Sequence, residues 1–314
     1  MSMGKTLKQA VKSGFKRLGL NVRRVPVRIG IKITRATSNE SDSDHDLPPL
    51  LNDPLEALHY TQGGKTAAFR CPLDRMGAAT GLKLAQWNPY VETLHEYRAG
   101  HRTYQGSTLE RYYENWQPGS AAEALIGFDN APEALSNAPS YALSTLPWRS
   151  LTVEEVIQHV RGWSRRDNSE HGLEDFQIDV HGYKAHGPVS RKKGQLEYER
   201  TTSIYESIKR DGYDRREGHA QIWLLKRGDD YLFINRGGYH RSVAMEALGY
   251  DAVPAVFTVP CVFDVKEAHY WPQVRRGIWT KKQAISYVDH LFNFDPRKWA
   301  RDRGLLQTNE SNST

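Results

Sequence analysis

The chain has 314 residues, of which 39% are hydrophobic, 25% charged and 11% aromatic, so it can bury a sizeable core and is not expected to be disordered. No run of about 18 apolar residues occurs, which excludes a membrane-spanning helix, and two cysteines are too few for a disulfide framework. The net charge of +6 is local, because residues 1–39 hold ten of the 43 Lys and Arg residues and none of the 37 Asp and Glu residues. The rest of the chain is slightly acidic and lacks the broad basic surface of a nucleic-acid-binding domain.

Residues 1–37 form a basic arm with the pattern of an amphipathic helix. Four apolar residues at spacings of four, four and three make one stripe, and basic residues occupy the other positions. The stripe consists of Leu7, Val11, Phe15 and Leu18. Three roles fit this helix: lying on an anionic membrane surface, binding nucleic acid, or packing on the body through its apolar stripe. Because two cysteines without a CxxC partner fit a reducing compartment, we expect a cytoplasmic protein, either free or, through this arm, peripheral to a membrane.

Residues 38–50 form an acidic linker that ends in prolines. Its alternating aspartates lack the turn glycine and the later Glu of a calcium loop, so no metal site is expected. In the following segment, residues 51–170, capping boxes predict helices within a helical, loop-rich extension. The boxes are Ser107-x-x-Glu110, Ser120-x-x-Glu123 and Thr152-x-x-Glu155, which precede helices predicted at 109–116, 121–126 and 153–163.

A helix with a polar face is predicted at residues 200–212. Arg200, Ser203 and Ser207 lie three and four residues apart, so they share one face of this helix. A guanidinium and two hydroxyls on one face suit phosphate oxygens, although a single Ser on a helix is more often only solvated.

A strand, a double-glycine turn and a second helix follow. Residues 231–234 are apolar and aromatic, Gly237 and Gly238 permit left-handed backbone, and residues 242–248 have a helical pattern. Free N–H groups and the positive end of the dipole favour an anion at the start of such a helix. His240 and Arg241 add charge-assisted hydrogen bonds, so this pattern predicts a phosphate site.

These two segments resemble boxes of the ParB and sulfiredoxin superfamily. Gly237-Gly238-Tyr239-His240-Arg241, followed by a helix and Val253-Pro254-Ala255-Val256-Phe257, is similar to its Gly-x-His/Arg-Arg box and Val-Pro strand. Residues 200–212 resemble the helix that precedes the first central strand, here 219–226. The resemblance covers about residues 186–258.

The resemblance implies an α+β fold. It predicts a ParB/sulfiredoxin-like core at residues 171–265, with the helical, loop-rich extension before it. Residues 266–303 form a C-terminal helical region, in which Thr280-x-x-Gln283 caps a helix that ends near Phe292, and residues 304–314 form a polar tail. We expect Ala284, Tyr287, Val288 and Leu291 on the buried side of that helix.

The resemblance also implies nucleotide binding, with ATP or another nucleotide and its Mg²⁺ as the expected ligands. In sulfiredoxins the matching positions hold the phosphates of ATP. This assigns phosphate binding to Arg200, Ser203, Ser207, Gly237, Gly238, Tyr239, His240 and Arg241.

Tyr239 sets this chain apart from sulfiredoxins. They carry a thiol after the second glycine, and a phenol with a pKa of about 10 cannot replace a thiolate near pH 7. Sulfinic-acid reduction is therefore excluded. The ring of Tyr239 is expected to project into the pocket, the alternative being the surrounding wall, with its hydroxyl hydrogen-bonded if it is buried.

Free serine kinases of the superfamily use a carboxylate near the start of this region. Glu197 and Glu199 are therefore the candidate catalytic bases, although a Glu near a helix start is also an ordinary dipole partner. The resulting hypothesis is a nucleotide-binding protein, an NTPase or a phosphotransferase with an unidentified acceptor. The alternatives are a non-enzymatic ParB-like module that binds DNA or protein, and a site with only a structural role.

Overall fold

The structure, a computed structural model, describes residues 20–21, 34–35 and 50–306. The chain divides into two units, Met1–Leu47 and Pro48–Thr314. In the first unit, β1 (Leu20–Asn21) pairs antiparallel with β2 (Thr34–Arg35). The predicted basic helix, nearly all of the acidic linker and residues 307–314 of the tail lie outside the described residues. Within the described part of the chain, no helix is both long and apolar enough to cross a membrane.

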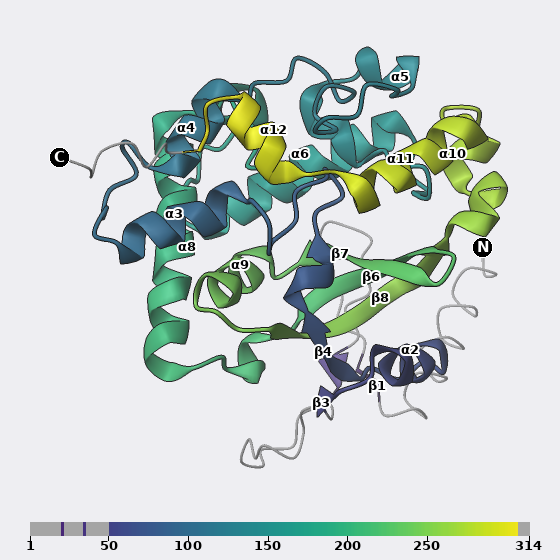
Figure 1. Cartoon of the computed structure of the whole chain (residues 1–314), viewed down its shortest axis with the longest axis horizontal. Coiled ribbons are helices and arrows are strands. Elements are labelled where there is room, and N and C mark those ends of the chain that lie inside the picture. The colour runs from purple at the N-terminus through teal and green to yellow at the C-terminus, as the bar shows by residue number, and fades with distance from the viewer. Residues whose placement is uncertain (1–19, 22–33, 36–49, 307–314) are drawn as a thin grey trace, which may run out of the picture. The chain divides into compact units, whose positions relative to one another are not determined.

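The second unit is built on a six-stranded mixed sheet with the order β3-β4-β8-β6-β7-β5 (Figure 1). β6 and β7 form an antiparallel hairpin, and β8 runs parallel to β6 and antiparallel to β4. With its helices, this sheet confirms the α+β class. The strands are β3 (Leu50–Leu51), β4 (Ala68–Pro72), β5 (Met76–Gly77), β6 (Ala220–Arg227), β7 (Asp230–Gly237) and β8 (Ala252–Asp264).

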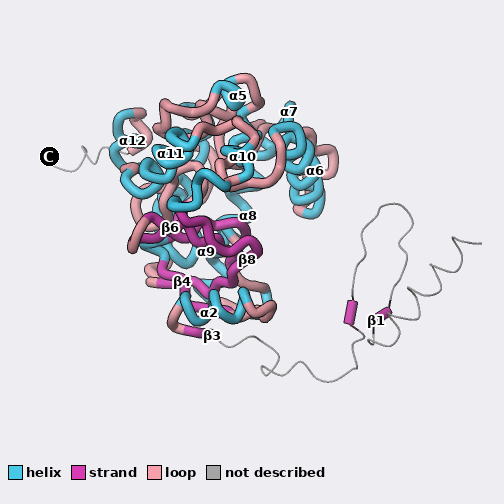
Figure 2. Tube along the Cα trace, turned by 90° about the vertical axis from the view of Figure 1, so that its right-hand side faces the viewer, coloured by secondary structure: helices cyan, strands magenta, loops and turns pink. Residues whose placement is uncertain are grey.

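Helices and loops make up most of the remaining unit. The α-helices are α2 (Pro54–Gln62), α3 (Pro89–Arg98), α4 (Thr108–Asn115), α5 (Glu133–Ser136), α6 (Val153–Glu170), α7 (Ile178–His181), α8 (Arg191–Asp211), α9 (Tyr239–Ala247), α10 (Pro272–Arg275), α11 (Lys281–Asn293) and α12 (Pro296–Asp302). Short 3₁₀ helices are η2 (Leu73–Arg75), η3 (Ser140–Ser144), η4 (Arg215–Glu217) and η5 (Val265–Tyr270). Figure 2 shows α2 beside β3 and β4, and α10, α11 and α12 gathered at the opposite end of the unit.

Three strands of the sheet come from residues 50–77, all but the first of which the sequence places in the helical extension. β4 pairs with β8, with Phe69 opposite Ala255 and Cys71 opposite Val253. This pairing joins residues almost two hundred positions apart. No local sequence pattern in the extension can therefore predict it. The sheet therefore reaches beyond the predicted core at residues 171–265.

Three of the helix starts follow the predicted capping. Thr152 and Thr280 begin α6 and α11 with reciprocal capping boxes, and Ser107 caps α4 by accepting the N–H of Glu110 at 3.3 Å. α6 continues to Glu170, about two turns beyond its predicted end at residue 163. The predicted buried side of α11 is confirmed at all four positions.

The helix predicted at residues 121–126 is wrong. The capping contact itself forms, because Ser120 Oγ accepts the N–H of Glu123 at 3.3 Å. The chain then leaves the helical path, since the N–H of Ile126 bonds to the carbonyl of Thr80 at 3.1 Å and not to a carbonyl one turn earlier. A long-range contact thus replaces the helical hydrogen bond.

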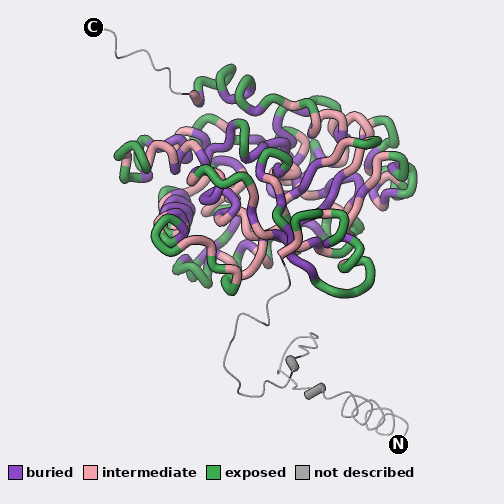
Figure 3. The backbone as a smooth tube through the Cα atoms, turned by 60° about the horizontal axis from the view of Figure 1, so that its bottom comes forward, coloured by how far each residue is buried: buried purple, intermediate pink, exposed green. Residues whose placement is uncertain are grey.

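Hydrophobic clusters cover both faces of the sheet. Alternate residues of β6 serve the two faces: Ile222 and Leu224 belong to one cluster, whereas Trp223 and Leu225 belong to the other. α3, α8 and α9 bury side chains in the first cluster, and α6 and α11 in the second. Figure 3 shows buried segments running through the middle of the unit and exposed segments at its rim. Because the sheet is packed on both faces, the C-terminal end of β7 is held in a defined position. The candidate site lies at this end.

Candidate functional site

The double-glycine turn at the end of β7 forms the start of α9. Gly238 is the N-cap, with φ of 72°, and a Cβ added to it would lie 3.1 Å from Ala220 Cα, so both backbone and space require glycine. The first helical hydrogen bond runs from the N–H of Ser242 to the carbonyl of Gly238. The N–H groups of Tyr239, His240 and Arg241 therefore precede this bond and have no acceptor within the helix. α9 begins three residues earlier than predicted, which places the basic pair in its first turn.

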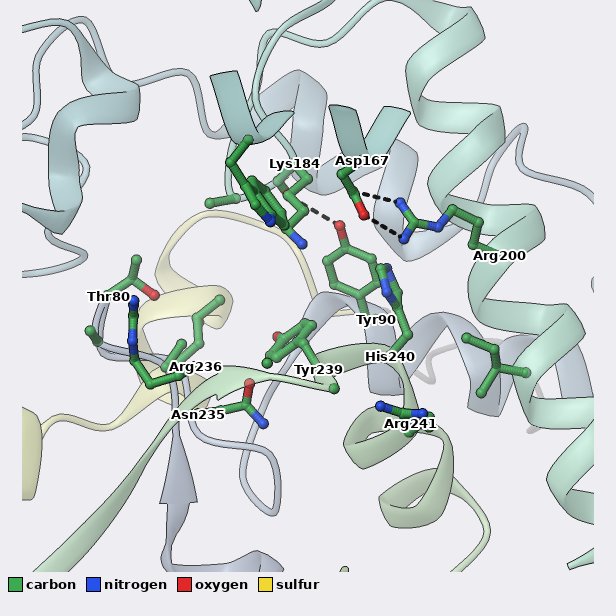
Figure 4. Close-up of a pocket in the computed structure, with 18 of the residues that line it drawn as sticks. Thr80, Tyr90, Asp167, Lys184, Arg200, Asn235, Arg236, Tyr239, His240 and Arg241 are labelled. Atoms are coloured by element: carbon green, nitrogen blue, oxygen red, sulfur yellow. Dashed lines mark hydrogen bonds and ion pairs between the residues drawn. The ribbon is translucent and has the colours of Figure 1, made fainter. Parts of the chain in front are cut away.

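A cavity of about 790 Å³ opens at this helix start (Figure 4). Its lining comes from α3, α6, α8 and α9, from the end of β7, and from the segments at residues 78–82, 143–149, 183–185 and 212–217. The basic side chains that line it are Arg149, His159, His171, Lys184, Arg200, Arg236, His240 and Arg241. Its volume lies within the range of small-molecule binding sites.

The structure brings most of the predicted phosphate-binding residues to this cavity. Arg200, Ser207 and the segment 237–241 line it. Ser203 does not line it and is exposed on α8. At about 100° per residue, position 207 returns to within roughly 20° of Arg200 around the helix, whereas position 203 lies roughly 60° to one side. Ser203 is thus misplaced as a phosphate ligand.

The two candidate bases, Glu197 and Glu199, do not line the cavity. Glu197 is fully buried, whereas Glu199 is exposed and accepts a hydrogen bond from Gln195 Nε2 at 2.7 Å. Residues two apart on a helix point in nearly opposite directions, so the two carboxylates cannot serve one site. Glu199 has no contact with the cavity, and Glu197 lies behind His240.

Glu197 is the centre of a buried ionic network. It accepts hydrogen bonds from His240 Nε2 at 2.8 Å, from Arg200 Nη1 at 3.4 Å and from Lys193 Nζ. Burial alone would raise the pKa of Glu197, but the His240 hydrogen bond and the charges of Lys193 and Lys184 hold this pKa well below its usual range. Glu197 is therefore an ionised acceptor that orients other groups.

Arg200 joins this network to α6. Its guanidinium donates to both carboxylate oxygens of Asp167, at 3.0 and 3.2 Å (Figure 4). The pKa of Asp167 is lowered: burial opposes the shift, and the Arg200 hydrogen bond with the nearby charges of Lys184 and Arg200 outweighs it. The positive charge of Arg200 is thus already matched, although its side chain reaches the cavity lining.

His240 presents one ring nitrogen to the network and one to the cavity. Because ionised Glu197 can only accept, Nε2 of His240 carries the proton of the 2.8 Å hydrogen bond. No described residue bonds to Nδ1 of His240, whose ring lies edge-on to that of Tyr90, 5.7 Å between centroids. Burial lowers the pKa of His240, although Glu197 acts in the opposite direction. Neutral His240 therefore offers Nδ1 as an acceptor.

Tyr239 forms part of the cavity wall. Its hydroxyl accepts a hydrogen bond from Asn88 Nδ2 at 2.7 Å, and burial raises its pKa to about 12. Asn88 also caps α3, because its Oδ1 accepts the N–H of Tyr90 at 3.1 Å. Tyr239 thus ties the start of α9 to the start of α3, and the expectation that a buried hydroxyl finds a partner is confirmed.

Several residues that line the cavity were not predicted as site residues from the sequence. Lys184 holds its ammonium 4.4 Å from the centroid of the Trp163 ring, while its carbonyl accepts hydrogen bonds from the hydroxyls of Tyr90 and Tyr113. Burial lowers the pKa of Lys184, and Glu197 and Asp167 act against this shift. Arg236 could have been found from its place beside the glycines. Lys184 and Arg149 lie in loops without any local motif.

Searches of protein-family models, curated proteins and solved structures found no match to the chain. Within residues 50–306, no group of three or more His, Cys, Asp or Glu side chains is arranged to hold a metal ion.

Proposed function

We propose that this chain binds a nucleotide, ATP or another nucleotide with Mg²⁺, whose phosphates lie against the start of α9. The observation that supports this most directly is the cavity of about 790 Å³ at a helix start with three N–H groups free of intrahelical acceptors. Helix starts of this kind favour anions through both the N–H groups and the dipole.

The charges in the cavity support an anionic ligand. Three of the lining carboxylates are matched by arginines, through the pairs Asp167–Arg200, Asp211–Arg210 and Asp214–Arg216. Four lining cations form no direct ion pair with a carboxylate among residues 50–306, although Lys184 lies near the charges of Glu197 and Asp167. They are Arg149, Lys184, Arg236 and Arg241. Arg241 donates to the carbonyl of Glu217 and keeps further guanidinium N–H groups for a phosphate.

Mg²⁺ would enter with the nucleotide. This ion needs only one or two carboxylates when phosphates and water complete its shell, so a three-residue cage is not required. Glu217 lines the cavity next to Arg241 and has no arginine or lysine partner in the described chain, so it is the residue that would hold the ion.

His240 is better placed than either glutamate to move a proton in a phosphoryl transfer. In that reaction an acceptor oxygen attacks the terminal phosphorus of the nucleotide. The bond from this phosphorus to the bridging oxygen breaks, and the proton of the acceptor hydroxyl passes to His240 Nδ1. Glu197 would hold the imidazole in the required orientation and tautomer through Nε2. Arg241 and the helix amides would carry the phosphate charge.

Calorimetric titration of the full chain with nucleoside di- and triphosphates, with and without Mg²⁺, tests this proposal. Arg241→Ala should weaken binding by about 10- to 150-fold, because loss of a charged hydrogen bond costs about 1.5–3 kcal/mol. Arg165→Ala, an exposed position on α6 outside the cavity, is the matched control and should bind like the parent.

Equal affinity of the parent and Arg241→Ala for each nucleotide would show that the assignment is wrong. Sequence-dependent binding of duplex DNA by a chain that binds no nucleotide would favour the DNA-binding alternative, and this outcome should show a steep salt dependence.

A further inference from the structure

Two arginines of the cavity share one tryptophan. The guanidinium carbons of Arg236 and Arg149 lie 4.0 and 5.3 Å from the centroid of the Trp223 ring. Trp223 belongs to β6 and is 5% exposed, so it is a rigid base for both side chains. Arg236 comes from the end of β7 and Arg149 from the loop before α6, and both line the cavity. The fold therefore brings two positive charges from distant parts of the chain to one place.

Neither charge is balanced by the protein. In residues 50–306, no carboxylate pairs with Arg149 or Arg236. Burial and the nearby charge of Arg149 lower the pKa of Arg236 to about 10, and burial lowers that of Arg149. His159 lines the same cavity, and its pKa is lowered by burial and by both arginines. Two cations this close destabilise each other unless an anion joins them.

Arg236 lies away from His240, which is in the first turn of α9. Figure 4 shows Arg236 beside Thr80, on the other side of Tyr239 from His240 and Arg200. Basic side chains thus lie on both sides of the Tyr239 ring in this view of the cavity. A nucleotide phosphate held at the start of α9 would leave Arg236 free.

We propose that Arg149 and Arg236 bind a second oxyanion, the phosphate or carboxylate group of a molecule that shares the cavity with the nucleotide. Planar guanidinium groups match both kinds of oxyanion through paired N–H donors. That this molecule is the phosphoryl acceptor rests on the proposed function, whereas the oxyanion site rests on the two arginines and Trp223 alone.

Thermal unfolding of the full chain tests the site, with potassium chloride, potassium phosphate and potassium acetate compared at equal ionic strength. At ten times the dissociation constant, phosphate or acetate should raise the Tm of the parent by about 3–6 °C. A response to phosphate alone identifies a phosphate site, and a response to both anions identifies a general oxyanion site.

The decisive variant is Arg149→Gln with Arg236→Gln. It should lose at least half of the anion-dependent rise in Tm, and its Tm in chloride should equal or exceed that of the parent, because the repulsion between the two cations is removed. Arg149→Lys with Arg236→Lys keeps both charges and should retain most of the rise. If the double glutamine variant does not fold, Arg236→Gln alone should lose part of the rise that Arg236→Lys retains.

Two results would overturn the site. They are an unchanged anion response in the glutamine variant and a parent that responds to neither anion. An unchanged response in a glutamine variant that is also less stable in chloride would show that the arginines only pack on Trp223. Arg241→Ala, measured in parallel, separates the two proposals, because nucleotide binding should depend on Arg241 and the second oxyanion on Arg149 and Arg236.

Discussion

Glu197→Gln tests the buried ionic network around Glu197 most directly. The carboxylate of Glu197 accepts hydrogen bonds from His240, Arg200 and Lys193 and is 0% exposed. An amide of the same shape has one oxygen to accept and an NH₂ group that faces the remaining donors. It also leaves the charge of Lys193 without its carboxylate partner, whereas Arg200 keeps its pair with Asp167.

Removal of one partner from a buried ion pair costs about 3–5 kcal/mol, a large share of the roughly 5–15 kcal/mol by which a folded domain is stable. For a unit of this size, such a loss lowers Tm by about 6–20 °C. Chemical denaturation monitored by circular dichroism would measure the loss. Glu199→Gln is the matched control, since it makes the same change two residues along α8 at an exposed site and should alter stability by less than about 0.5 kcal/mol.

The double variant Lys193→Met with Glu197→Gln completes the test. Because both buried charges are then removed, its destabilisation should be smaller than the sum of the two single losses by about 0.5–3 kcal/mol. Denaturation midpoints of Glu197→Gln and Glu199→Gln that coincide with that of the parent would refute the ionic network, and additive single losses would refute the Lys193–Glu197 pair.

Two further predictions concern Tyr239 and pH. Tyr239→Phe should destabilise the fold by about 1–3 kcal/mol, since buried Asn88 loses its acceptor, whereas Tyr250→Phe, at a 43% exposed position, should change little in the same denaturation assay. The pKa of His240 is lower in the folded chain than its ordinary value of 6.5, so at mildly acidic pH the unfolded chain binds a proton that the folded chain does not. Stability should therefore fall as pH drops below about 6.5, by at most about 1.4 kcal/mol per pH unit for this proton. His240→Asn should make the dependence of the unfolding free energy on pH shallower, and an identical dependence would show that His240 does not contribute. The lowered pKa of Glu197 causes a further loss of stability at still lower pH.

Local signals in the sequence were sufficient for much of the secondary structure. The capping boxes at Thr152 and Thr280 and the apolar run at residues 231–234 correctly located α6, α11 and β7. Such signals act within one turn or one strand, where hydrogen bonding and side-chain periodicity are set by neighbouring residues. Gly238 was identified for the same reason, because the left-handed turn before α9 depends on the residue itself.

Tertiary structure decided which polar groups meet. Glu197 and Glu199 looked equivalent as bases, but burial of one face of α8 placed Glu197 behind His240 and left Glu199 in solvent. Long-range contacts that no local pattern encodes brought Arg149 to Arg236 and Asp167 to Arg200. The chain thus specified the glycine turn and its basic residues locally. The charge balance around them depends on distances between segments, and only the packed fold determines these.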